Sequence, residues 1–129
     1  MSEPSDVSER DVEQVSAVVL LSGDLMFASK VKGAAEAAGY EFHFGGAIPE
    51  TDSEVMWVIV DLATQSKVVD GLVEVCSEKC PRARLLAFGP HVQVARLEKA
   101  RAAGIRTVLT RGQFDRSLAT LFQSEPSPE

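Results

Sequence analysis

The sequence has 129 residues, a formal net charge of −6 and 45% hydrophobic residues. This length suits one domain with a hydrophobic core and is too short for two ordinary ones. The apolar content is too high for a disordered chain, the longest apolar runs are far too short to span a membrane, and the acidic N-terminus has no apolar leader. We therefore expect a single globular domain with a cytoplasmic location and no membrane partner.

The two ends of the chain differ in composition from the rest. Residues 1–14 are rich in acidic residues and Ser and carry almost nothing to bury, so we expect a disordered acidic tail there. Residues 123–129 include Glu125 and Glu129 and are expected to form a second disordered tail. These ends supply the whole net charge, so the domain expected over residues 15–122 is close to neutral.

Charge is divided unevenly within that domain. Residues 15–78 hold three Lys and ten acidic residues, whereas residues 79–122 hold nine Lys or Arg and two acidic residues. A basic surface can attract nucleic acid, an acidic protein or the acidic tails of the chain itself. Because no aromatic residues are interleaved with the basic ones, the sequence does not favour nucleic acid as the partner.

Five short segments rich in β-branched or aromatic residues predict strands. They lie at residues 16–21, 40–44, 55–60, 84–88 and 107–109. The first, third and fourth are nearly continuous apolar runs, which is typical of strands buried on both faces. A parallel central sheet follows, and Trp57 is expected to belong to its core.

Helical patterns alternate with these strands. The first begins with Asp24 as a candidate N-cap and ends at Gly39. The others are predicted at residues 66–79, at 90–104 with Pro90 in the first helical position, and at 114–122. The alternation predicts an α/β doubly wound domain.

One connection is too short for this scheme. Only residues 45–54, with the sequence GGAIPETDSE, separate the second and third predicted strands. A parallel crossover normally needs a dozen or more residues and usually a helix. We therefore predict that the second helix is missing or shortened to one turn.

The two cysteines, Cys76 and Cys80, have no second pair and no nearby His at zinc-finger spacing. We expect no zinc site. The sequence favours a buried thiol at Cys76 and a more exposed one at Cys80.

A ligand site would be expected outside the carboxyl ends of the strands, as in other open α/β sheets. The residues there are Ser22, Gly23, Asp24, Asp61, Gly89, Pro90, His91, Thr110 and Arg111. Asp61 is either a reactive group or the N-cap of a helix, and Asp24 is explained better as an N-cap than as a metal ligand. His91 is either a loop residue bonded to nearby backbone or a phosphoacceptor or pH sensor.

Three segments, VIVDL (58–62), AEAAGYEF (35–42) and ARAAGIRTVLTRGQF (100–114), are arranged as in a known family. Across residues 16–122 the chain resembles the receiver (CheY-like) domain of bacterial response regulators. The resemblance implies a five-stranded parallel sheet of flavodoxin-like order 2-1-3-4-5 and a role in two-component signal transduction.

The resemblance also assigns roles at the strand ends. Asp61 stands at the position of the family's phosphoacceptor. The positions of the two metal-binding acidic residues fall on Ser22 and Gly23, with Asp24 one residue later. The position of the hydroxyl residue falls on Gly89, and that of the lysine on Arg111.

These departures favour a divergent pseudo-receiver in which Asp61 pairs with Arg111 and is not phosphorylated. We expect no catalytic activity and no cofactor. The chain would act as a signalling or protein-interaction module that binds an acidic protein, or that forms a homodimer through the last two helices and the fifth strand. The basic residues expected on that interaction face are Arg96, Lys99, Arg101, Arg106 and Arg116.

Two alternatives stay open. In the first, the chain is a single-domain response regulator phosphorylated on Asp61, with Mg²⁺ held by Asp24 and Asp61. In the second, it is a flavodoxin-like binder of a small phosphorylated ligand in the same crevice.

Overall fold

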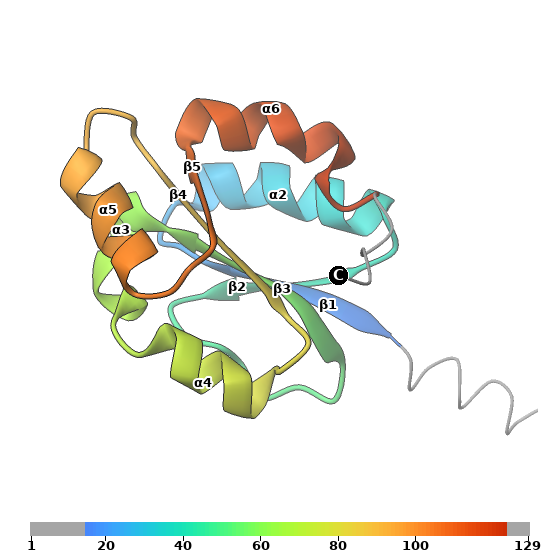
Figure 1. Ribbon diagram of the computed structural model, residues 1–129. Helices are drawn as coiled ribbons and strands as arrows, with labels where there is room; N and C mark the ends of the chain where they lie inside the picture. Colours follow the sequence, from blue (N-terminus) through green and yellow to red (C-terminus); the bar gives the residue numbers. More distant parts are fainter. Residues whose placement is uncertain (1–14, 124–129) are drawn as a thin grey trace, which may run out of the picture.

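The computed structural model describes residues 15–123, and the tails expected at residues 1–14 and 123–129 lie outside this range except for Gln123. Within it, five parallel strands form one sheet in the order β2-β1-β3-β4-β5, which confirms the predicted doubly wound topology (Figure 1). The strands are β1 (Ser16–Leu21), β2 (Glu41–Gly45), β3 (Glu54–Asp61), β4 (Arg84–Gly89) and β5 (Thr107–Thr110).

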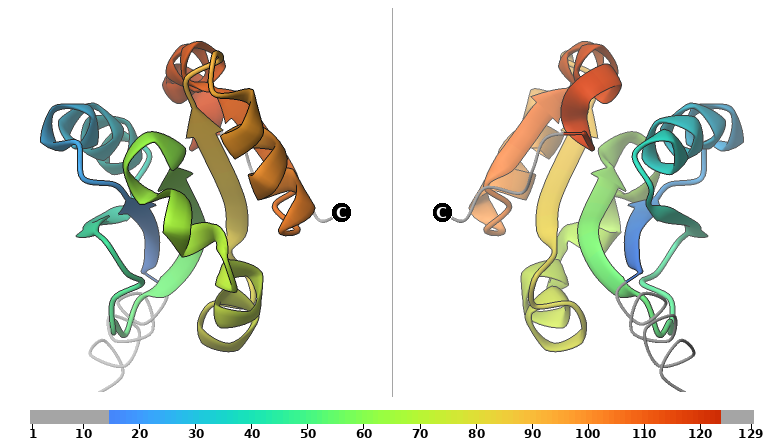
Figure 2. Two further views of the ribbon diagram at one scale, coloured as in Figure 1. Left: turned by 90° about the vertical axis from the view of Figure 1, so that its left-hand side faces the viewer. Right: turned by 90° about the vertical axis from the view of Figure 1, so that its right-hand side faces the viewer.

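Helices cover both faces of this sheet (Figure 2). On one face lie α2 (Leu25–Ala37) and α6 (Arg111–Leu121), and on the other lie α3 (Leu62–Gln65), the 3₁₀ helix η1 (Ser66–Val69), α4 (Leu72–Lys79) and α5 (Val94–Ala102). Alternate residues of the central strands point to the two faces, so the strands are apolar on both sides.

Two separate hydrophobic cores result. Under α2 and α6, the rings of Phe88 and Phe114 stack with centroids 4.4 Å apart, and Phe27 packs against both. The other core contains Val58 and Val60 from β3 and Leu72 from α4. Trp57 differs from its predicted place in the core, because it is only half-buried and contacts Phe122 edge-on.

The predicted loss of the second helix is confirmed. Residues 46–53 connect β2 to β3 without any helical turn. In this segment Ile48 packs against the core under α4. The loop thus supplies a small part of the apolar cover that a helix would otherwise give.

The prediction of one continuous helix over residues 66–79 is wrong. The chain forms η1, turns at Asp70 and Gly71, and only then forms α4. Gly71 has a φ of +78°, a left-handed conformation that costs little for glycine and that other residues rarely adopt. The face predicted for this segment is nevertheless buried, since Val69, Leu72 and Cys76 all contribute to the core.

We predict that Gly71→Ala lowers the free energy of unfolding by about 1 kcal/mol, because alanine is strained at positive φ. Urea denaturation followed by fluorescence measures the change. Gly33→Ala is the matched control: Gly33 lies within α2, is exposed, and has no atom within 4 Å of an added Cβ. That variant should gain up to about 1 kcal/mol, and equal effects at the two sites would contradict the assignment.

The helix predicted over residues 90–104 begins later than expected. Pro90 lies in a turn, closed by a bond from the backbone N–H of Gln93 to the carbonyl oxygen of Pro90 at 3.0 Å, and α5 starts at Val94. The last helix begins earlier than predicted, at Arg111 rather than Phe114. Thr110 and Gln113 form a capping box there, in which each side chain bonds the other's backbone N–H.

Both cysteines are buried, so the expectation of a more exposed Cys80 is wrong. Burial raises the pKa of the Cys76 thiol to about 12 and also raises the pKa of Cys80. Between residues 15 and 123, no cluster of three or more His, Cys, Asp or Glu side chains could hold a metal ion. No helix in the same range has both the length and the apolarity needed to cross a membrane.

Candidate functional site

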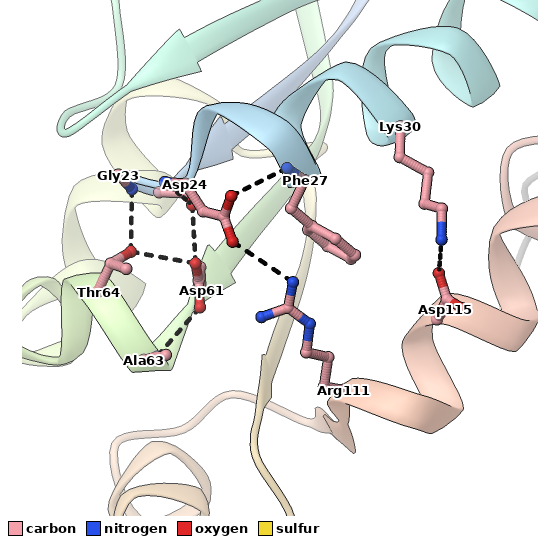
Figure 3. Close-up of polar contacts among 10 residues, drawn as sticks. Gly23, Asp24, Phe27, Lys30, Asp61, Ala63, Thr64, Arg111 and Asp115 are labelled. Atoms are coloured by element: carbon pink, nitrogen blue, oxygen red, sulfur yellow. Dashed lines mark hydrogen bonds and ion pairs between the residues drawn. The ribbon is translucent and has the colours of Figure 1, made fainter.

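The carboxyl ends of β1 and β3 bring Ser22, Asp24 and Asp61 together, as the topology predicted. Figure 3 shows Asp24 and Asp61 in this arrangement. Ser22 and Asp61 are almost completely buried, with 3% and 1% of their surfaces exposed. They are the only buried polar residues among residues 15–123. The side chains are therefore fixed by their hydrogen bonds, because a buried polar group without a partner is costly.

Both oxygens of the Asp61 carboxyl group accept hydrogen bonds from other groups of the protein. Oδ1 accepts from the backbone N–H of Ala63 at 3.0 Å, so Asp61 is the N-cap of α3. Oδ2 accepts from the Ser22 hydroxyl at 2.7 Å and from the Thr64 hydroxyl at 3.1 Å. The N-cap interpretation of Asp61 is thus confirmed.

The chain after β1 is tied into the same network. The Ser22 hydroxyl accepts from the backbone N–H of Asp24 at 3.0 Å, and the N–H of Gly23 donates to the Thr64 hydroxyl at 2.9 Å. Thr64 therefore links the two strand ends, a role that the sequence analysis missed. An Asp followed three residues later by a hydroxyl residue, at the start of a helix, was the available signal.

Arg111 does not pair with Asp61, and the predicted ion pair between them is wrong. Its Nη2 atom lies 3.4 Å from Oδ2 of Asp24, and its guanidinium stacks on the Phe27 ring at 4.5 Å. The reason is geometric: Asp61 turns back into the α3 N-terminus, whereas Arg111 is the first residue of α6 and lies against α2 (Figure 3).

Asp24 is the N-cap of α2, as predicted. Its Oδ1 accepts from the backbone N–H of Phe27 at 3.0 Å. That bond, followed by the contact with Arg111, holds the pKa of the Asp24 carboxyl below its ordinary value of 3.8. Both oxygens of Asp24 are therefore engaged by donors from the protein itself.

These residues do not fit a magnesium ion. Mg²⁺ needs an octahedral set of oxygen ligands, usually one or two carboxylates together with waters. Here the Asp61 oxygens accept three hydrogen bonds, and Asp24 caps a helix and faces a guanidinium. A metal would have to break these contacts and approach Arg111, so we derive no chemical step through it.

Gly89 ends β4 with little room for a side chain. An added Cβ would lie 3.2 Å from Cβ of Leu62 and 3.6 Å from both Cδ1 of Leu62 and Cδ2 of Leu97. The hydroxyl that the resemblance places here is replaced by packing from α3 and α5. His91 lies exposed in the following turn and forms no hydrogen bond or ion pair with residues 15–123.

The five predicted basic residues do not form one free face. The Arg96 Nη1 atom donates to the carbonyl oxygens of Leu62 and Ala63 at 3.1 and 3.2 Å, so Arg96 braces the start of α3. Lys99 and Arg101 form ion pairs with Asp70 and Glu98 at 3.8 and 2.8 Å.

Arg106 and Arg116 are different. Both are exposed, and neither has an ion pair or hydrogen bond within the described part of the chain. They are the members of the predicted face that are available to an acidic group.

Comparison with known proteins supports the fold. No family model matches the sequence, and no curated protein is similar enough in sequence to count as a relative. Among solved structures, the chain is similar to a response regulator from Thermotoga maritima, with 14% identity and a TM-score of 0.56 over 83% of this chain and 98% of that one.

Two other structures are comparably similar. One is a response regulator protein from Burkholderia pseudomallei with a phosphorylated aspartic acid, a calcium ion and citrate, at 17% identity and a TM-score of 0.60 over 86% of this chain and 68% of that one. The other is the beryllofluoride-activated NtrC4 receiver domain dimer, at 13% identity and a TM-score of 0.53 over 84% and 96%. Because all three identities are low, the comparisons establish only the fold of the chain, which is that of receiver domains.

Proposed function

We propose that this chain is a pseudo-receiver, a non-catalytic signalling module that binds another protein and is not phosphorylated on Asp61. The observation that carries the proposal is the use of both Asp61 oxygens. A phosphoacceptor needs a free carboxylate oxygen and a cation to neutralise the transferred phosphoryl group. Here Ser22, Ala63 and Thr64 donate to the carboxyl group, and the Arg111 guanidinium pairs with Asp24 instead.

The same network gives the module one fixed conformation. Asp61 joins β3 to β1 through Ser22, and Asp24 joins α2 to α6 through Arg111. Lys30 and Asp115 form a second ion pair between those helices. Signalling in this proposal depends on which partner is present and not on the transfer of a phosphoryl group to the strand ends.

The partner surface in this proposal is the region of α5, β5 and α6, which presents Arg106 and Arg116. The NtrC4 structure is described as a receiver domain dimer, and a second copy of this chain or an acidic protein would be the corresponding partner. Exposed arginines of this kind contribute to the rate and specificity of association more than to affinity.

The alternative is a single-domain response regulator that is phosphorylated on Asp61. It is favoured by one observation, the retention of an aspartate at the carboxyl end of the central strand β3. In that case the hydroxyls of Ser22 and Thr64 would have to release Asp61 before any transfer.

A melting experiment distinguishes these two functions. We expect Mg²⁺ with beryllofluoride, a phosphoryl mimic, to leave the melting temperature of the full chain unchanged, because a ligand that does not bind the native state cannot stabilise it. Asp61→Asn is the control. A rise of several degrees that is lost in Asp61→Asn would contradict the pseudo-receiver and establish the alternative.

A further inference from the structure

A groove lies at the opposite end of the sheet from the strand-end site. It has a volume of about 620 Å³ and opens where β4 begins. The cause is a difference in strand length: β4 starts at Arg84, but β5 is paired with it only from Leu86 onward. The start of β4 therefore has no strand beside it on its outer side, and Trp57 of β3 lies next to it, in register with Arg84.

Apolar side chains from both faces of the sheet make up about half of the lining of this groove. Val73 and Cys76 from α4 contribute to it, together with Leu85, Leu86 and Leu121. Because burial raises the pKa of the Cys76 thiol to about 12, that thiol is neutral at physiological pH and behaves as an apolar group. The surface is therefore suited to a hydrophobic ring or chain.

The charged residues that line the groove within residues 15–123 are Arg84 and Arg106, and none of the lining residues in this range is acidic. The Arg84 guanidinium lies over the Trp57 ring, 5.6 Å from its centroid. Arg106 is exposed and forms no ion pair or hydrogen bond with residues 15–123.

We propose that this groove binds a small amphipathic anion, in which an aromatic or aliphatic body lies against Trp57 and the apolar side chains of the lining and an acidic group meets Arg106. The volume lies within the range of about 300–1,000 Å³ that small-molecule sites occupy. Guanidinium groups grip carboxylate, sulfonate and phosphate oxygens in a planar, bidentate arrangement. The proposal does not depend on the function of the strand-end site.

The test uses 1-anilinonaphthalene-8-sulfonate, an aromatic sulfonate whose emission rises in apolar surroundings. Trp57 is the only tryptophan of the sequence, so energy transfer from it reports binding beside the groove. We expect saturable binding to one site on the full chain. Arg106→Ala should weaken it by about threefold and Arg106→Glu by about tenfold.

Three controls make the result specific. Arg116→Glu changes an arginine of α6 that is also exposed and has no ion pair or hydrogen bond with residues 15–123, but does not line the groove, and it should leave the affinity for the probe unchanged. Ser77→Phe fills the groove from an exposed lining position of α4, and it should abolish binding without destabilising the fold. N-phenyl-1-naphthylamine, which lacks the sulfonate, should bind equally well to the wild type and to Arg106→Ala.

Two results would overturn the proposal. One is a loss of affinity in Arg116→Glu as large as that in Arg106→Glu, which would show that the probe responds only to net charge. The other is a rise in affinity when Glu125 and Glu129 are both changed to Gln, which would assign the groove to the acidic end of the chain itself. Unchanged affinity in that double variant supports a ligand from outside.

Discussion

Asp61→Ala is expected to lower the free energy of unfolding by about 3 kcal/mol. The variant removes the N-cap of α3 and leaves the Ser22 and Thr64 hydroxyls without their acceptor. Loss of an N-cap costs about 1 kcal/mol, and the buried Ser22 hydroxyl left without its acceptor costs about 1–3 kcal/mol. Thr64 is exposed, so its hydroxyl can bond to water instead. Urea denaturation followed by Trp57 fluorescence measures the difference.

Asp61→Asn is the matched variant. Its side-chain oxygen can still accept from the N–H of Ala63, and the hydroxyls of Ser22 and Thr64 can reorient to accept from the amide. We expect it to lose about 1 kcal/mol, much less than the alanine variant. An alanine variant as stable as the wild type, or more stable, would mean that Asp61 is held under strain, as in a site built for chemistry.

Gly89→Thr, which restores a hydroxyl at the end of β4, is expected to lower the free energy of unfolding by about 2 kcal/mol. The added Cβ would lie 3.2 Å from Cβ of Leu62, which is closer than ordinary packing permits. Leu62 is itself buried, with 1% of its surface exposed, and α5 packs behind it. This strain is difficult to relieve, because the obstructing atom, Cβ of Leu62, is attached directly to the backbone and cannot move by a rotamer change.

Gly45→Thr provides the comparison for this variant. Gly45 also ends a strand, lacks positive φ, and has no atom within 4 Å of an added Cβ. Its effect should be below about 0.5 kcal/mol. If the two threonine variants were equally stable, Leu62 would have room to move, and loss of the hydroxyl at residue 89 would no longer follow from packing.

The strands could be predicted to within one or two residues because their signal is local. A strand buried on both faces reads as an apolar run bounded by polar or turn residues, as at 16–21 and 55–60. The signal for the break between η1 and α4 at Gly71 is also local. The Asp70-Gly71 pair is a turn signal that the apolar spacing around it outweighed in the prediction.

The site itself could be predicted only as a set of neighbours. The topology places residues 22–24, 61 and 111 at one edge of the sheet. It does not determine which of their side chains form hydrogen bonds or ion pairs with one another. From the sequence, the Asp61 side chain could point either toward the start of its own helix or toward Arg111. Its hydrogen bonds with Ser22 and Thr64, and the stacking of Arg111 on Phe27, depend on rotamers that three separate elements fix together.

The short link between β2 and β3 has a mechanical consequence. It must return along the length of β1 and cross to its other side, a distance of more than about 20 Å, with only residues 46–53. Eight residues reach at most about 29 Å when fully extended. The link therefore limits how far β2 and β3 can move apart. Removing two of its residues would cut the reach to about 22 Å, close to the distance that it has to span.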